Sequence, residues 1–325
     1  MNQLSLTGTK AAGPLGYHSW ALFEWARNPY VILVTIYIFA PYFSGTVVGD
    51  PVRGQTLLGY ANSISGALIA VTAPLLGAIA DKKGRRKPWI ATFVALMVPG
   101  IFLLWYAEPG GGGIGILPTL GLIIIVAILF EYSAVFHNAM LPSVAPASKV
   151  GMVSGLALAY GNLAGLLLMI FVLYAFALPG NSEWSFIPEQ PLFGLDPTTA
   201  EPDRIVGPMV ALWVMLFTLP LVLFTPDGAD AGKSIGTAVR EGLSEVWRTL
   251  GQLRHFANVG LYLLTRMIFN DGMAGVLIFG GVYAAGTFGW GTTELLLFGI
   301  ITSFSAAIGA VLGGYLDDRL GSKRA

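Results

Sequence analysis

The sequence contains no cysteine and little charge for its length. Charged residues make up 11% of the 325 positions, whereas about a quarter is typical of soluble domains. The absence of cysteine excludes disulfide bonds and cysteine-ligated metal. The formal net charge is zero, so the composition provides no basic surface for nucleic acid. Because 55% of the residues are hydrophobic, the composition also excludes an ordinary soluble domain.

Metal and cofactor motifs are missing as well. The three histidines, His18, His137 and His255, are scattered and have no metal-ligand spacing. The segment 232–234 reads Gly-Lys-Ser, but a phosphate-binding loop needs glycine at position 227, which is Asp. The sequence therefore predicts no metal site, no cofactor and no catalytic residues.

Long hydrophobic runs, in contrast, fill most of the chain. A membrane span needs about 20 apolar residues, and no run shows the alternation of a barrel strand. We therefore predict an all-α integral membrane protein with eight spans. Their approximate bounds are 20–48, 57–80, 89–106, 116–140, 151–178, 205–224, 256–285 and 293–316.

Lys and Arg residues between the spans gather on one side. They lie at 82–87, 233–254 and 319–324, on the side that carries the N-terminus, whereas the other side holds Arg53 and Arg204. The positive-inside rule then predicts a cytoplasmic N-terminus. The residues before the first span lack an apolar core, so we expect no cleavable signal peptide and a first span that directs insertion itself.

A charged motif lies between the second and third predicted spans. Asp81 falls near the negative C-terminal end of its helix, so its carboxylate should seek cations or the positive N-terminus of a neighbouring helix. Gly77, one turn earlier, would let that neighbour approach. A basic cluster that only sets topology is the alternative interpretation. The motif comprises Gly77, Asp81, Lys82, Gly84, Arg85 and Arg86.

A weaker copy of this motif follows the eighth predicted span. Asp318 matches Asp81 and Gly321 matches Gly84, with Gly314 and Arg319 completing the copy. An offset of six spans is typical of two parallel halves. In that architecture four more helices should follow, so we expect a truncated product, a partial gene product or a genuine half-size variant.

The first motif resembles the signature loop between helices two and three of the major facilitator superfamily. Further segments are similar to one branch, the vacuolar amino-acid effluxer-like (autophagy-related permease-like) proteins. This resemblance implies a twelve-helix bundle, alternating-access transport and a motif loop that clamps the cytoplasmic ends of the halves. Glu24 and Arg27 stand where the branch usually has Asp and Asn, so its ligand preference is not implied. The similar segments are 23–30, 39–43, 136–142, 153–155, 160–165, 193–196 and 269–272.

The predicted organisation has four parts: a cytoplasmic N-terminus at 1–19, a six-helix half at 20–225, a linker at 226–255 and an incomplete second half at 256–325. Apolar residues three or four apart within 235–253 predict an amphipathic helix along the inner membrane surface. Both a linker between two halves and a solvated connecting helix remain open interpretations.

Charged residues inside the spans are the candidate functional residues, because burying a charge in a membrane is costly. Glu131 and Arg266 each lie roughly 15 Å deep at about 1.5 Å per residue. Arg27 and Arg266 occupy near-equivalent places in the two repeats, so we expect them to bind a substrate carboxylate or another anion. Glu131 and Asp271 are the candidate proton-coupling groups. The alternative is that these two acids simply neutralise the arginines.

Nearby polar and small residues complete the prediction. Asn28 and Asn270 are candidate substrate-binding residues, although hydrogen bonding between helices is the commoner use. The pairs Gly161/Gly165 and Gly309/Gly313 are expected to be packing interfaces.

The sequence thus predicts a secondary transporter of small solutes, proton-coupled, with amino-acid or small-anion export as the substrate class that the resemblance suggests. Its partners would be the solute, the bilayer and protons, without nucleic acid, and the full-length protein would be monomeric. A multi-pass protein of a bacterial inner (plasma) membrane is expected. The alternative is a non-transporting receptor or assembly protein built on a transporter half. A membrane enzyme would need a catalytic constellation, which the sequence lacks.

Overall fold

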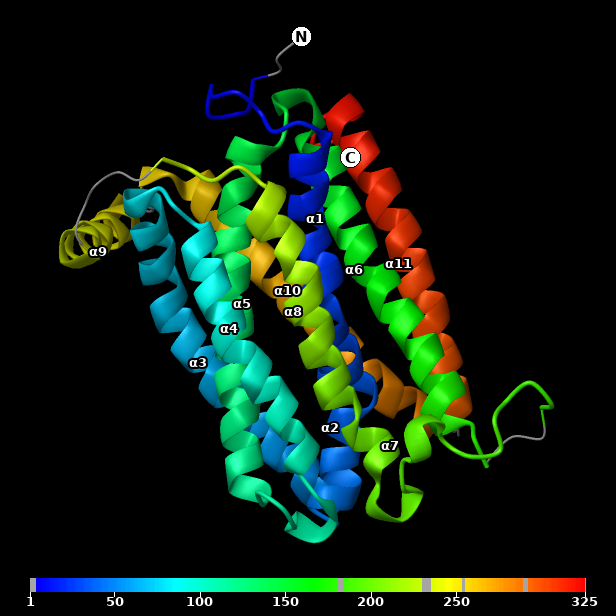
Figure 1. Ribbon diagram of the computed structural model, residues 1–325. Coiled ribbons are helices and arrows are strands. Elements are labelled where there is room, and N and C mark those ends of the chain that lie inside the picture. Colours follow the sequence, from blue (N-terminus) through cyan, green and yellow to red (C-terminus); the bar gives the residue numbers. More distant parts are fainter. Residues whose placement is uncertain (1–3, 181–183, 230–234, 253–254, 289–291, 325) are drawn as a thin grey trace.

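The computed structural model describes residues 4–180, 184–229, 235–252, 255–288 and 292–324. These residues form a bundle of long helices without a β-strand in the described ranges, which confirms the all-α class (Figure 1). The helices are α1 (Pro14–Pro29), α2 (Phe39–Tyr42), α3 (Pro51–Lys83), α4 (Lys87–Leu103), α5 (Ile116–Val144), α6 (Val150–Val172), α7 (Glu201–Arg204), α8 (Val206–Phe224), α9 (Ile235–Gln252), α10 (Ala257–Phe288) and α11 (Thr292–Leu320).

Seven helical segments in the described part are long and apolar enough to cross a membrane. They correspond to all the predicted spans but the seventh, and they make the chain a multi-pass integral membrane protein. The seventh predicted span, 256–285, forms the helix α10 but is not among these seven. The segments are Pro14–Val47, Pro51–Ala80, Lys87–Tyr106, Ile116–Val144, Ala147–Ala177, Glu201–Phe224 and Leu297–Leu320.

The first span is nearly continuous but changes its winding after Pro29. Wider π turns occupy Tyr30–Tyr37, after the α-helical residues of α1. Proline has no N–H to donate to the carbonyl four residues earlier, that of Trp25. The indole N–H of Trp213 on α8 donates to that carbonyl instead, at 2.9 Å. The proline therefore both alters the winding of α1 and creates an acceptor that joins it to α8.

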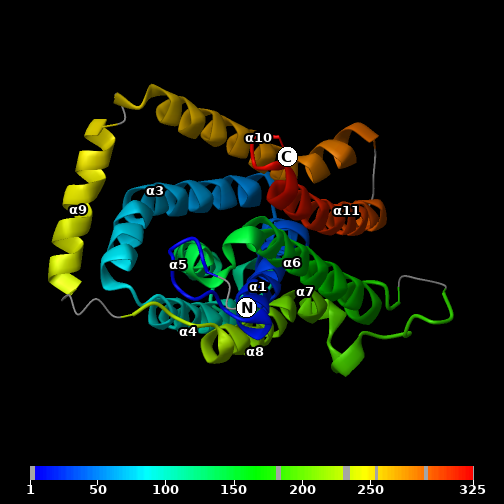
Figure 2. The same cartoon turned by 90° about the horizontal axis from the view of Figure 1, so that it is seen from above.

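The spanning helices surround α1. It packs on α6 and α8, while α5 packs between α3 and α4, and α11 lies along α6 (Figure 2). Large side chains such as Trp20, Phe23 and Phe136 are fully buried between these helices. Within a membrane, apolar burial does not favour one helix pairing over another, so close packing of small residues becomes important.

One of the two predicted glycine interfaces is confirmed. At Gly161, a Cβ atom would lie 3.0 Å from the Asn28 Cβ, and at Gly165 it would overlap the Ile32 side chain, so both glycines let α1 approach α6 closely. At Gly309 and Gly313 a Cβ would meet no described atom within 4 Å, so the interface there stays a prediction. Those two glycines lie on a face of α11 turned away from α6, and spacing alone does not specify which face a helix presents.

The charged loops gather at one end of the bundle, as the sequence predicts. The N-terminus, the turn between α3 and α4, the helix α9 and the C-terminal end of α11 all lie there (Figure 1). We call this the motif end, because residues 84–87 and 317–321 belong to it. The turn between α4 and α5 and the long segment between α6 and α7 lie at the opposite end, here called the far end.

The predicted amphipathic segment forms α9, which packs across the motif end of α3 (Figure 2). A Cβ added at Gly242 would lie 2.9 Å from the Cβ of Ala78, so the two helices approach closely at this point. Trp247 on α9 is 71% exposed. The segment 235–252 is therefore helical and contacts the end of α3, the helix that leads into the first motif.

Candidate functional site

The first motif makes a tight turn between α3 and α4. Gly84 ends α3 with φ 82°, a backbone conformation that residues with a Cβ rarely adopt, and α4 begins at Lys87. Gly77 lies opposite Val135 on α5. A Cβ at Gly77 would lie 3.8 Å from the Val135 Cγ1, which is an ordinary van der Waals contact. Asp81 and Lys82 of the predicted motif are outside the set of side chains that the structure describes.

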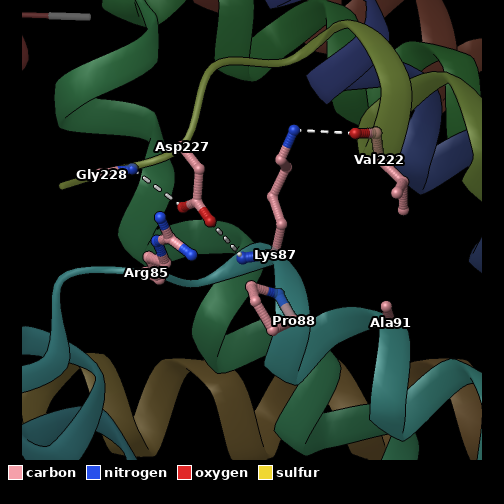
Figure 3. A pocket seen from close by; sticks show the side chains of 7 residues that line it. All are labelled: Arg85, Lys87, Pro88, Ala91, Val222, Asp227 and Gly228. Carbon is pink, nitrogen blue, oxygen red and sulfur yellow. Dashed lines mark hydrogen bonds between the residues drawn. The ribbon is translucent and has the colours of Figure 1, made fainter. Parts of the chain in front are cut away.

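Asp227 caps the start of α4. Its Oδ1 accepts a hydrogen bond from the backbone N–H of Arg86 at 2.9 Å. Its Oδ2 accepts one from the backbone N–H of Lys87 at 3.2 Å (Figure 3). A carboxylate is favoured here by the unpaired N–H groups and by the positive end of the helix dipole. The sequence analysis did not single out Asp227 as a functional residue. The only sequence signal for this cap was an acid that follows the sixth predicted span, on the same side of the membrane as the basic residues at 82–87.

Lys87 makes the converse contact at the end of α8. Its Nζ donates to the carbonyl oxygen of Val222 at 2.7 Å (Figure 3). It also donates to the carbonyl oxygen of Thr225 at 2.7 Å. A cation is favoured at a helix C-terminus, where carbonyl groups lack partners. The start of α4 and the end of α8 are thus joined by an acid on one and a cation on the other. Arg85 is exposed beside them, at the edge of an open cavity of about 450 Å³.

The second motif places its acid at the start of another helix. Asp318 Oδ1 accepts from the N–H of Gly151 at 2.8 Å, and Oδ2 accepts from the N–H of Met152 at 2.7 Å. These are the first residues of α6, whose N-terminus has no capping side chain of its own. Asp318 therefore occupies the environment that the sequence predicts for the motif acid, the positive end of a neighbouring helix. We call these two hydrogen bonds the Asp318 clamp.

Glycines bring α6 and α11 close enough for this clamp. A Cβ at Gly155 would overlap the carbonyl oxygen of Ala310, and a Cβ at Gly314 would overlap that of Gly151. Gly321 ends the helical part of the motif with φ 79°, much as Gly84 does in the first copy. The Arg319 guanidinium lies over the Tyr315 ring, 4.3 Å from its centroid. The glycines of the second motif thus permit backbone contact between helices from the two predicted halves.

A second group of polar residues lies inside the bundle. Arg27 is 6% exposed, and its Nη1 donates to Glu24 Oε1 at 2.9 Å. Its guanidinium carbon lies 3.9 Å from the centroid of the Phe130 ring on α5, a cation–π contact. His137 Nδ1 lies 3.5 Å from the same Glu24 oxygen. Glu24, which the sequence analysis noted only as a departure from its family, is therefore the residue that joins Arg27 to His137.

The other candidate residues lie apart from this group. Asn28 is partly buried against Gly161 of α6. Glu131 is exposed on α5, close enough to Tyr30 to interact with it electrostatically. Arg266, Asn270 and Asp271 are all exposed on α10. The structure thus brings Arg27 to Glu24 rather than to Glu131, and it does not bring Arg27 and Arg266 into a common buried site.

A bundle of several apolar helices with a charged motif turn at one end defines a class, that of multi-pass membrane proteins. Two comparisons with known proteins narrow this class. The family model described as "Vacuole effluxer Atg22 like" matches residues 44–325. A Bacillus subtilis (strain 168) protein, "Uncharacterized MFS-type transporter YxiO", is 24% identical over 309 residues, which cover 94% of this chain and 68% of that protein.

The chain belongs to the Atg22-like vacuole effluxer family, whose members are membrane transporters related to the major facilitator type. The resemblance inferred from the sequence motifs is therefore confirmed at the level of family and fold. A membrane transport role follows for the class, with a small-molecule substrate and the lipid bilayer as its partners. The relatives are transporters, which points away from an enzyme.

Proposed function

We propose that the protein is a secondary active transporter that moves a small solute by alternating access. In this proposal the Asp318 clamp closes the motif end by joining α6 of the first predicted half to α11 of the second. The motif end is the cytoplasmic side of a bacterial inner membrane, with the N-terminus inside. The observation that carries the proposal is the pair of hydrogen bonds from Gly151 and Met152 to Asp318.

The strength of such a clamp suits a reversible gate. A hydrogen bond to a charged group contributes about 1.5–3 kcal/mol. A ligand that prefers one state by about 5.5 kcal/mol can shift a two-state equilibrium from 1:99 to 99:1. Because both partners of Asp318 are backbone N–H groups at a helix end, water can replace the carboxylate when the helices separate. The clamp can therefore close the pathway and still be opened by substrate or proton binding.

The proposed solute is an amino acid or another small anion. Arg27 is buried within the first span, and its Nε has no hydrogen-bond partner, which leaves a donor for a carboxylate. Asn28 lies next to it in sequence, and Arg266 and Asn270 would contribute from α10 when the halves approach each other. Glu131 and Asp271 are the proposed proton-coupling groups. The support for Glu131 is that it is an ionisable side chain within the span formed by α5, where a charge is costly unless it has a function.

Flux measurements test the proposal. The native protein is reconstituted into liposomes, and the twenty radiolabelled amino acids are offered one at a time, with and without a pH gradient. We expect at least one of them to be taken up above protein-free liposomes. Asp318→Asn should then lower that flux several-fold, because the amide removes the charge that α6 stabilises.

Glu189→Gln is the control. Glu189 is an exposed acid in the segment between α6 and α7, at the far end, so the flux of this variant should equal that of the native protein. An absence of flux for every amino acid would contradict the proposed substrate class and favour a receptor or assembly role. Equal flux in Glu189→Gln and Asp318→Asn would contradict the gating role of the clamp.

A further inference from the structure

His137 is a buried histidine whose protonation can be worked out from its two contacts. Its side chain is fully buried, and its ring stacks on Trp20 with 4.3 Å between the ring centroids. Its Nε2 lies 2.9 Å from the carbonyl oxygen of Trp20. A carbonyl oxygen only accepts hydrogen bonds, so Nε2 must carry the hydrogen. In the neutral ring, the other nitrogen, Nδ1, would then be an unprotonated acceptor.

That second nitrogen faces an acid. Nδ1 has no hydrogen-bond partner, and Glu24 Oε1 lies 3.5 Å away, with the Glu24 side chain 21% exposed. If the histidine were neutral and the glutamate ionised, two lone pairs would face each other in a buried site, which costs free energy. One proton placed on either atom removes this conflict. It turns the contact into an ion pair if Nδ1 holds it, or into a hydrogen bond if Oε1 does.

We propose that His137 Nδ1 and Glu24 Oε1 form a binding site for one exchangeable proton, and that its occupancy controls whether Arg27 is free to bind an anion. The first part stands on the geometry of the buried pair alone. The second part rests on the proposed transport function, because it makes this proton a coupling proton, in addition to those proposed for Glu131 and Asp271, and Arg27 the group that holds the solute.

The link to Arg27 comes from a shared oxygen. Arg27 Nη1 and His137 Nδ1 both contact Glu24 Oε1, at 2.9 Å and 3.5 Å. When a proton from water binds at Nδ1 or Oε1, the site gains one positive charge, and the Glu24 charge available to Arg27 falls. The Arg27 guanidinium then has N–H groups without an acceptor, and an anionic solute can accept their hydrogen bonds. Loss of the proton restores the pair between Glu24 and Arg27 and expels the anion.

Proton and anion should therefore bind together and leave together, and each should strengthen the binding of the other by the same factor. This is the thermodynamic requirement for coupling a solute to a proton gradient. The Phe130 ring covers one face of the Arg27 guanidinium, whose carbon lies 3.9 Å from the ring centroid. This limits the directions from which an anion can reach Arg27.

Titratable side chains on α1 and α5 other than Glu24 make no polar contact with His137 among the described side chains. From α1, the charged groups that face it are Glu24 and, through it, Arg27. On α4, Trp89 and Phe93 pack on Phe136 beside it. The Tyr132 hydroxyl on α5 forms a hydrogen bond with the Thr72 hydroxyl on α3. His18 Nδ1 forms one with the Tyr160 hydroxyl at 3.0 Å. Glu131 lies on the exposed side of the same helix.

The test is nuclear magnetic resonance of the full chain labelled with ¹⁵N in its histidines. Because the sequence has three histidines, His18→Gln and His255→Gln assign the His137 signals. Over about pH 5 to 9, the range in which histidine titrates, we expect His137 to pass between a doubly protonated ring and a neutral ring protonated at Nε2. In Glu24→Gln, which lacks the carboxylate that faces Nδ1, the share of the doubly protonated form should fall relative to the native protein at the same pH.

Infrared spectroscopy covers the case in which the acid holds the proton. A carboxylic acid band that disappears in Glu24→Gln, together with a neutral His137, also supports the site. A neutral His137 with an ionised Glu24 throughout this pH range would overturn the proposal. Glu189→Gln, at an exposed acid of the far end, is the control and should leave the His137 signals unchanged.

A transport measurement separates this inference from the function on which its second part rests. His137→Gln keeps an amide that can donate to the Trp20 carbonyl but cannot bind a proton. In liposomes, its uptake of a labelled amino acid should lose dependence on the pH gradient while exchange continues. Titration of His137 without any flux would contradict the transport function and leave the proton site standing. Flux that remains gradient-dependent in His137→Gln would overturn the coupling role.

Discussion

Three charged side chains at the motif end, those of Asp227, Asp318 and Lys87, contact backbone groups at helix ends. Asp227 and Asp318 each accept from two successive N–H groups at a helix start, and Lys87 donates to two carbonyl oxygens at a helix end. Such contacts use both the unpaired backbone groups and the helix dipole. They hold helix ends in place without requiring a second charged side chain.

Replacing Lys87 tests one of these contacts. Lys87→Met should lower the free energy of unfolding by about 1–2 kcal/mol, because two charge-assisted hydrogen bonds to α8 are lost and two carbonyl groups lose a partner. Thermal unfolding in detergent measures the change. Arg85→Met removes a neighbouring, exposed cation and should change stability by less than about 0.5 kcal/mol. Equal effects of the two substitutions would argue against the contact with α8.

Glu131 gives the second prediction at this scale. Its position is exposed, so Glu131→Gln should leave folding unchanged. If Glu131 is a proton-coupling group, the substitution abolishes transport driven by a pH gradient but spares solute exchange, because only the proton step needs an ionisable side chain. Paired gradient-driven and exchange measurements in liposomes decide the matter. Normal gradient-driven transport would show that Glu131 has no proton role.

At the scale of helices, the contact between α6 and α11 depends on the absence of side chains. Gly155 faces the carbonyl oxygen of Ala310, and Gly314 faces that of Gly151. The Asp318 clamp lies at the end of this contact, so separating the helices would also lengthen its hydrogen bonds. The two features form one unit, in which close packing positions the acid.

Gly155→Ala tests this unit. The new methyl group meets backbone, which does not move as a flexible side chain does, so α6 and α11 must separate at a cost of about 1–3 kcal/mol. Gly309→Ala is the matched control on α11, because its Cβ would meet no described atom within 4 Å. There we expect a neutral effect or a gain of up to about 1 kcal/mol from helix propensity.

Thermal unfolding of both variants gives the comparison. A Gly155→Ala protein as stable as the Gly309→Ala protein would contradict the close approach of the two helices. The flux of Gly155→Ala should also fall, because the clamp cannot close fully when its helices are held apart.

For the whole molecule, the charged motifs, α9 and both chain ends gather at the motif end, and the long segment between α6 and α7 lies at the far end (Figure 1). The Lys and Arg distribution of the sequence then predicts that the motif end faces the cytoplasm. Since the chain has no cysteine, single cysteines can report the side of the membrane without any background.

Two exposed positions serve this purpose. Gln190→Cys at the far end should react with a membrane-impermeant maleimide added to intact cells, whereas Arg85→Cys at the motif end should react only after permeabilisation. Mass spectrometry of the labelled protein gives the extent of reaction. The reverse labelling pattern would contradict the proposed orientation.

The sequence motifs were most informative where the physics is local. Hydrophobic runs predicted the spanning helices, because a helix in a membrane satisfies its own backbone. Gly84 and Gly321 marked helix ends, because a positive φ is a property of one residue. The sequence predicts that Asp81 seeks cations or the N-terminus of a neighbouring helix. Its counterpart Asp318 makes the second kind of contact, although the sequence did not say with which helix.

Other features depended on which helix faces come together, and tertiary structure alone decided them. Arg27 pairs with Glu24 rather than Glu131, and Gly155 rather than Gly309 meets a neighbouring backbone. The cap that Asp227 forms on α4 and the contact between His137 and Glu24 were likewise decided by the tertiary structure. Composition and spacing establish that a helix crosses the membrane, but its rotation about its own axis is set by packing against several neighbours at once. The identity of each contact therefore emerges only when the bundle is assembled.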